Sequence, residues 1–164
     1  MATKPLVPVE EYLRTKLDGP DPEYLDGELV ERHRGEFEHG AVQARLAAAF
    51  LRLRKMLCVA SELHLRITPS RYRIADLAVF LEKPATPIPN SPPYVAIEIV
   101  SPGDRYTEIH KKLEEYRSWG VRHIWLVDPE SGNFSIYDEA GLREVPAFVL
   151  ADLELTIAKS EIFE

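Results

Sequence analysis

The chain has 164 residues, with 20 lysines and arginines against 27 aspartates and glutamates, which gives a formal net charge of -7. Its length and a hydrophobic content of 45% suit one domain with a substantial core, so we expect a single domain over residues 1–164. We find no apolar run of about 18 residues and no signal-peptide core after Met1, and therefore expect no membrane association and a cytoplasmic location. The single cysteine, Cys58, excludes an intrachain disulfide and a multi-cysteine zinc site.

The acidic balance argues against a generally basic coat for nucleic acid, but the charge is unevenly distributed. Residues 125–164 hold 2 basic and 9 acidic residues, which accounts for the whole excess. Residues 51–100 hold 7 basic and 4 acidic residues. The middle of the chain can therefore present a modestly basic surface to a polyanion, with weak and salt-sensitive binding.

The N-terminal third predicts a short helix over residues 9–15, a hairpin turning at Asp26 and Gly27, and a longer helix over residues 38–57. An Asp-Gly pair between apolar runs favours a tight hairpin turn. In the longer helix, apolar residues recur at spacings of three and four, which makes one apolar face. Basic residues that lie off this face form a stripe of Arg45, Arg52 and Lys55.

The rest of the chain predicts strands and one further helix. A proline-rich segment over residues 83–93 can be neither helix nor central strand, and we interpret it as a stiff loop between two strands. The core order is helix, three strands, helix, strand, which predicts an α/β fold with an N-terminal helix and hairpin and extra C-terminal strands. The predicted strands cover residues 59–68, 72–81, 94–101 and 124–127, with weaker ones at 134–137, 144–149 and 153–157, and the helix runs from after residue 104 to Trp119.

Two neighbouring strands each carry an acid where a buried residue is expected. Glu98 interrupts the apolar run over residues 94–100, and Asp76 shares a period-2 face with apolar residues. Buried carboxylates are costly unless they are paired or bind a metal, and two on adjacent strands suit a divalent cation. The structural alternative is a pair of acids at strand ends, capped by backbone N–H groups or paired with Arg71 or Arg73.

The helix after Glu98 supplies a lysine. Leu113 and Tyr116 mark the buried face, Lys112 lies on the shoulder of that face, and Lys111 points to water. The periodicity therefore favours Lys112 as the lysine that reaches inward. The alternative is a solvated i,i+4 pair with Glu108, which contributes only a few tenths of a kcal/mol.

Several segments together resemble the Uma-two family of restriction-endonuclease-like proteins in the PD-(D/E)XK nuclease superfamily. The resemblance covers about residues 10–129. The opening segment Glu23–Glu28 and His39 are also similar to that family. The segments that carry the resemblance are DLAVF (76–80), AIEIVSP (96–102), KLEEY (112–116) and GVRHIWLVDP (120–129).

The resemblance implies an endonuclease that hydrolyses DNA phosphodiester bonds with Mg²⁺ or Mn²⁺. Asp76, Glu98 and the backbone carbonyl of Ile99 would hold the metal, and Lys112 would complete the catalytic set. Two positions depart from the superfamily signature: Ala75 replaces the proline before the first acid, and Val100 replaces the lysine two residues after the second. In this family the lysine is found on the following helix, where Lys112 stands.

Further residues are implied as accessory or DNA-binding groups. Glu23 could join the metal site, although we favour a solvated hairpin acid. His39 could touch a phosphate or serve as a helix N-terminal residue, and Glu108 could orient Lys112 or act as an outer acid. The expected contacts to the DNA backbone come from Arg45, Arg52, Lys55, Arg66, Arg71 and Arg73.

A different class of protein stays open as the alternative. A catalytically inactive nuclease-fold module that binds DNA or another protein would also fit, and the valine at position 100 and the acidic balance favour it. RNA stays open as a substrate. A homodimer or higher homo-oligomer is compatible with the resemblance, because nucleases of this fold often pair to cut both strands.

Overall fold

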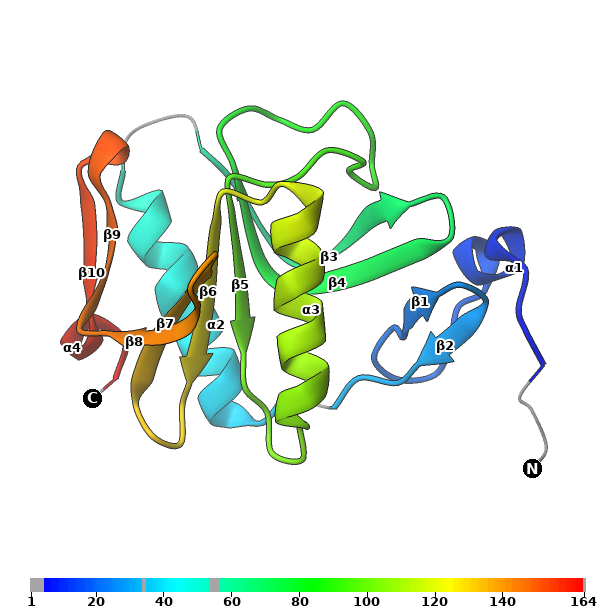
Figure 1. Ribbon diagram of the computed structural model, residues 1–164, viewed down its shortest axis with the longest axis horizontal. Helices are drawn as coiled ribbons and strands as arrows, with labels where there is room; N and C mark the ends of the chain where they lie inside the picture. The colour runs from blue at the N-terminus through cyan, green and yellow to red at the C-terminus, as the bar shows by residue number, and fades with distance from the viewer. Residues whose placement is uncertain (1–4, 34, 54–56, 164) are drawn as a thin grey trace.

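The computed structural model of the chain describes residues 5–33, 35–53 and 57–163 (Figure 1). None of its described helices is long and apolar enough to cross a membrane. The helices are α1 (Val9–Arg14), α2 (Phe37–Leu51), α3 (Tyr106–Trp119) and α4 (Lys159–Ile162), and a 3-10 turn covers Ala151–Leu153. The strands are β1 (Glu23–Leu25), β2 (Glu28–Val30), β3 (Cys58–Thr68), β4 (Arg71–Phe80), β5 (Val95–Ile99), β6 (His123–Asp128), β7 (Asn133–Asp138), β8 (Gly141–Val145), β9 (Ala147–Leu150) and β10 (Leu155–Ala158).

A central sheet carries helices on both faces. Its strand order is β2-β1-β4-β5-β6-β7-β8, with β3 paired to β4, and β9 and β10 form a separate two-stranded sheet. The parallel pair β5 and β6 is joined by α3, as parallel strands require a crossover connection. In Figure 1, α2 and α3 lie on opposite sides of the sheet.

Helices α2 and α3 each bury one apolar face against the sheet, and each forms a separate core on its side of the sheet. The α2 core contains Leu46 and Phe50 packed with Trp125 of β6, where the Phe50 and Trp125 rings stack 5.7 Å apart. The α3 core contains Leu113 and Tyr116 packed against small residues of β4 and β5. Because helices cover both faces of the sheet, β4 and β5 are buried along nearly their whole length.

The long strand β4 has an incompletely paired edge. On one side β3 accompanies β4 along most of its length. On the other side β5 pairs with Leu77 to Val79, and β1 pairs only with Arg71 and Tyr72. The backbone of Ile74 lies between these two partners, so side chains must satisfy its N–H and carbonyl groups. The side chains of Glu23 and Lys112 fill this gap between β1 and β5.

The predicted fold class and the order helix, three strands, helix, strand are confirmed. Two boundaries are wrong. The helix predicted over residues 38–57 ends at Leu51, and Cys58 begins β3 because pairing with β4 overrides the helical pattern. The strand predicted over residues 144–149 is split at Pro146, which has no N–H for a ladder, into β8 and β9 in different sheets.

Candidate active site

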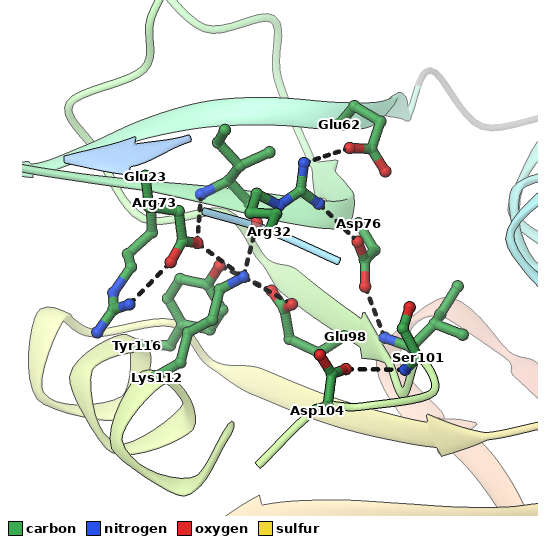
Figure 2. Close-up of polar contacts among 12 residues, drawn as sticks. Glu23, Arg32, Glu62, Arg73, Asp76, Glu98, Ser101, Asp104, Lys112 and Tyr116 are labelled. Carbon is green, nitrogen blue, oxygen red and sulfur yellow. Dashed lines mark hydrogen bonds and ion pairs between the residues drawn. The ribbon is translucent and has the colours of Figure 1, made fainter. Parts of the chain in front are cut away.

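Asp76, Glu98 and Lys112 meet in one cleft of about 570 Å³ beside the gap in the β4 edge (Figure 2). β4, β5 and α3 each contribute one of them. Asp76 and Glu98 are buried, with 4% and 8% of their surface exposed. The three side chains that the sequence pattern singles out are therefore brought together, within a largely desolvated region.

Lys112 lies at the centre of the cluster. Its Nζ is 2.7 Å from Glu98 Oε2, 2.8 Å from Glu23 Oε1 and 2.7 Å from the carbonyl oxygen of Ile74. Burial works against its charge, but Glu23, Glu98 and Asp76 together hold the pKa of Lys112 above its ordinary value. The side chain is thus a fixed ammonium with all three donors engaged.

Lys111, the neighbour of Lys112, points away from the cluster as the helical periodicity predicts. Its side chain is 69% exposed, and it pairs with Glu108 at 3.0 Å. Glu108 lines the cleft but forms this exposed i,i+3 pair rather than one with Lys112. Glu108 is predicted to orient Lys112, but the ion pair that it forms is with Lys111.

Glu98 accepts hydrogen bonds on both carboxylate oxygens. Tyr116 donates its hydroxyl to Oε1 at 2.8 Å, and Lys112 occupies Oε2. Burial raises the pKa of Glu98 to about 7, the nearby charges of Asp76 and Glu23 add to this, and Lys112 opposes it. Near neutral pH, Glu98 is therefore present in both its protonated and its ionised form.

Asp76 is held from three directions. The backbone N–H of Ile99 donates to Oδ2 at 2.7 Å, Arg32 Nη2 donates to Oδ1 at 2.9 Å, and His39 Nε2 lies 3.4 Å from Oδ2. Burial raises the pKa of this carboxyl, but the bond with His39, the charge of Lys112 and the Ile99 N–H outweigh it and lower the pKa. Asp76 is accordingly a carboxylate.

Glu23 belongs to the cluster, so the expectation of a solvated hairpin acid is wrong. Only 4% of its surface is exposed, because β1 docks against β4. Ile74 N–H donates to it at 2.9 Å and Arg73 Nη1 at 2.8 Å. Burial opposes its ionisation, but Lys112, Arg73 and the Ile74 N–H lower the pKa of Glu23 to about 2.

His39 lies in the first turn of α2 and contacts the candidate metal-binding acid Asp76. It is buried, and its hydrogen bond with Asp76 raises its pKa although burial works against the charged form. Its position near the helix N-terminus agrees with one of its two predicted roles.

The predicted DNA-contacting residues are dispersed. Arg45 donates to the carbonyl of Ile162 at 2.8 Å and Arg52 pairs with Glu161 at 2.6 Å, so both hold the C-terminal segment against α2. Arg66 is half-buried on β3, and Lys55 lies outside the described residues.

Arg71 and Arg73 form an ion-pair network instead of an open basic surface. Both contact Glu115 at 2.6 Å, Arg71 also contacts Asp26 at 2.5 Å, and Arg73 continues to Glu23. The Arg73 side chain is only 8% exposed. This network corresponds to the arginine pairing that the structural alternative anticipates, but with other acids than Asp76 and Glu98.

Sequence reasoning missed Arg32, Gln43 and Glu62 and the polar role of Tyr116. Tyr116 is expected on the buried face of α3, but the pattern does not show that its hydroxyl reaches Glu98. Arg32 stands in an irregular segment after β2, where neither helical nor strand periodicity applies. Only the tertiary structure brings it to Asp76.

The donor set fits a small divalent cation that keeps part of its water. Among the residues that the structure describes, no three His, Cys, Asp or Glu side chains converge as a ready metal-binding group. Mg²⁺ needs only one or two carboxylates and prefers hard oxygen ligands, which Asp76 and Glu98 supply. A guanidinium bound directly to Asp76 shows that the site already stabilises positive charge there.

The mixed sheet with a parallel pair, a crossover helix and helices on both faces is an α/β fold that closely matches a solved putative nuclease structure. The chain belongs to the Uma2 (Uma-two) family, described as "Putative restriction endonuclease", whose profile matches residues 9–160. A crystal structure described as that of a putative nuclease from Anabaena variabilis ATCC 29413 is similar to this chain with a TM-score of 0.82 and 18% sequence identity, covering 94% of this chain and 96% of that chain. At this identity the likeness shows the fold alone. No curated protein matches the sequence.

Proposed function

We propose that this protein is a divalent-metal-dependent endonuclease that hydrolyses phosphodiester bonds of DNA. The observation that carries the proposal is the convergence of Asp76, Glu98 and Lys112 in one cleft, two carboxylates and an ammonium from three separate elements. Family membership supports nuclease chemistry, because the family is described as "Putative restriction endonuclease". DNA as substrate and magnesium as cofactor are parts of the proposal.

The residues that would hold the ion are Asp76, Glu98 and the backbone carbonyl of Ile99. When bound, Mg²⁺ or Mn²⁺ supplies a Lewis acid for a phosphate oxygen and a water of lowered pKa. Ile99 N–H donates to Asp76 and Tyr116 donates to Glu98, so both carboxylates are oriented before any ligand arrives.

Lys112 supplies a positive charge that does not depend on the ion. Its ammonium is fixed by two carboxylates and a carbonyl, so no reorganisation is needed when negative charge develops on the phosphate. Because Glu98, Glu23 and the Ile74 carbonyl take all three of its donors, Lys112 would act on a water or a phosphate through its charge, or after one of these contacts opens. Lys112 on α3 would thereby take the role of the strand lysine, whose position is occupied here by Val100.

The test is cleavage of supercoiled plasmid, linear DNA and RNA by the purified full chain, with Mg²⁺, Mn²⁺ or EDTA. We expect nicking of DNA that EDTA abolishes and that Asp76→Asn and Asp76→Ala lose, while Glu82→Gln, an exposed acid after β4, cuts like the parent. Circular dichroism verifies that the variants are folded. Equal cleavage by the Asp76 variants would remove that residue from the mechanism, and a parent that cuts neither DNA nor RNA would support the inactive binding module instead.

A further inference from the structure

Arg32 is a largely buried cation of the cleft that the proposed reaction leaves unused, and it contacts a candidate metal-binding acid directly. Its side chain is 15% exposed, with Nη1 2.5 Å from Glu62 Oε2 and Nη2 2.9 Å from Asp76 Oδ1 (Figure 2). The guanidinium therefore bridges a candidate metal-binding acid and a second carboxylate. Because an arginine stays charged at any physiological pH, it is a permanent cation at the position where a metal would bind Asp76.

Glu62 faces Asp76 across two paired strands. The register pairs Ser61 with Leu77 and Leu63 with Ala75, so Glu62 stands opposite Asp76. Like charges directly opposite each other in a sheet are destabilising, and Arg32 between them removes the repulsion. A cation between the two facing acids stabilises them, and in this structure Arg32 is that cation.

The backbone at Glu62 is strained in a way that suits this role. Its φ of 50° lies in the left-handed region, which non-glycine residues seldom occupy and which tends to occur at functional positions. Gln43 of α2 donates to Glu62 Oε1 at 3.0 Å and to the carbonyl of Asp76 at 2.6 Å. Gln43 therefore fixes Glu62 relative to Asp76, and Glu62 is a carboxylate partner that Arg32 would keep if its contact with Asp76 opened.

We propose that Arg32 is a substrate-phosphate clamp that occupies Asp76 in the metal-free protein and is released to the phosphate when a divalent ion takes Asp76. The ion and the guanidinium would compete for Asp76, because two cations on one partly buried carboxylate repel each other strongly. Once released, Arg32 keeps its anchor on Glu62 and has Nη2 free. A guanidinium fork matches phosphate oxygens in two-point hydrogen bonding, and Arg32 lines the cleft that the substrate would enter.

This inference rests on the proposed function but makes a prediction that a merely structural arginine does not. Loss of any cation beside Asp76 should tighten metal binding, but loss of an arginine with only a structural role would leave cleavage at saturating metal unchanged. A competing arginine lowers metal affinity while promoting cleavage. Its removal must therefore separate the two quantities, with tighter metal binding and slower chemistry in the same variant.

The test is isothermal titration of the DNA-free full chain with Mn²⁺, followed by cleavage rates at saturating metal. We expect Arg32→Ala to bind Mn²⁺ about tenfold more tightly than the parent and to cleave about 100-fold more slowly. Glu62→Gln should bind Mn²⁺ more weakly than the parent. Without the Glu62 carboxylate, Arg32 would bind Asp76 more tightly and the ion would displace it less readily. Arg143→Ala, which removes an exposed arginine paired with Asp138, should match the parent in both measurements.

Arg32→Lys provides a second variant that keeps the charge and the fold if Arg32→Ala is unstable. We expect it to retain the parent's Mn²⁺ affinity within about threefold and to lose most cleavage, since an ammonium lacks the planar fork. Mn²⁺ binding that is unchanged or weaker in Arg32→Ala, with the parent binding normally, would overturn the clamp and leave the proposed function standing. A parent that binds no Mn²⁺ would overturn the proposed function itself and the clamp with it.

Discussion

Glu23 and Lys112 lie 2.8 Å apart, although one belongs to the N-terminal hairpin and the other to α3. The contact crosses the gap that β1 and β5 leave on the edge of β4, where Ile74 N–H and carbonyl bind the same two side chains. The hairpin is therefore part of the site rather than an appendage. Glu23 and Lys112 together bind the backbone groups of Ile74 that no neighbouring strand pairs on this edge of β4.

Replacing Lys112 tests this closure. Lys112→Met leaves Glu23 and Glu98 buried without their shared cation, and we expect the free energy of unfolding to fall by about 3 kcal/mol, with cleavage falling about 100-fold. Urea denaturation monitored by circular dichroism measures the first quantity. Lys111→Met is the matched control, because that side chain is 69% exposed, and it should stay within about 0.5 kcal/mol of the parent. Similar losses in both variants would show that the contacts of Lys112 with Glu23 and Glu98 contribute no more to stability than the exposed pair of Lys111.

The hydroxyl of Tyr116 should contribute through Glu98. Tyr116→Phe keeps the ring that fills the α3 core but leaves Oε1 of a buried acid without its donor, so we expect a loss of about 1–3 kcal/mol in urea denaturation. Tyr137→Phe removes a hydroxyl that donates to the exposed acid Glu114, and we expect a loss below about 1 kcal/mol. The reverse order would contradict the assigned hydrogen bond.

Mn²⁺ affinity should depend on pH through Glu98. Its pKa is raised to about 7, whereas that of Glu23 is about 2, so between pH 8 and pH 6 Glu98 gains a proton while Glu23 stays ionised. A divalent ion requires the carboxylate, so affinity should fall by up to about tenfold per unit as the pH drops below 7. His39 acts in the same direction, since its bond to Asp76 raises its pKa and its charge repels the ion. Calorimetry across this range measures the slope, and a flat profile would contradict the role of Glu98 as ligand.

Phe148 should anchor the small C-terminal sheet to the main one. Its ring stacks 4.1 Å from Trp125 and 4.1 Å from Phe134, and it is 1% exposed. Phe148→Ala should therefore lower the free energy of unfolding by about 3–5 kcal/mol. The neighbouring residue Val149 is 58% exposed, and Val149→Ala should change it by no more than about 0.5 kcal/mol. Both values come from urea denaturation, and a small effect at Phe148 would mean that β9 and β10 pack independently of the main sheet.

The basic residues show why charge counts alone do not locate a nucleic-acid surface. Arg45 and Arg52 follow α2 as the helical pattern predicts, but contacts with the C-terminal segment occupy them. Arg73 is similarly occupied by Glu23 and Glu115. A sequence window shows which residues share a helix face, and it does not show which distant acids will neutralise them.

The sequence by itself determined the order of the core elements, the acids on two neighbouring strands and the choice of Lys112 over Lys111. These follow from period-2 and period-3.6 patterns, which the local backbone geometry imposes on any chain. The tertiary structure alone decided the burial of Glu23 and the placement of Arg32 between Glu62 and Asp76. Such contacts join segments distant in the chain, and they exist because strand pairing leaves a gap whose buried polar groups must find partners.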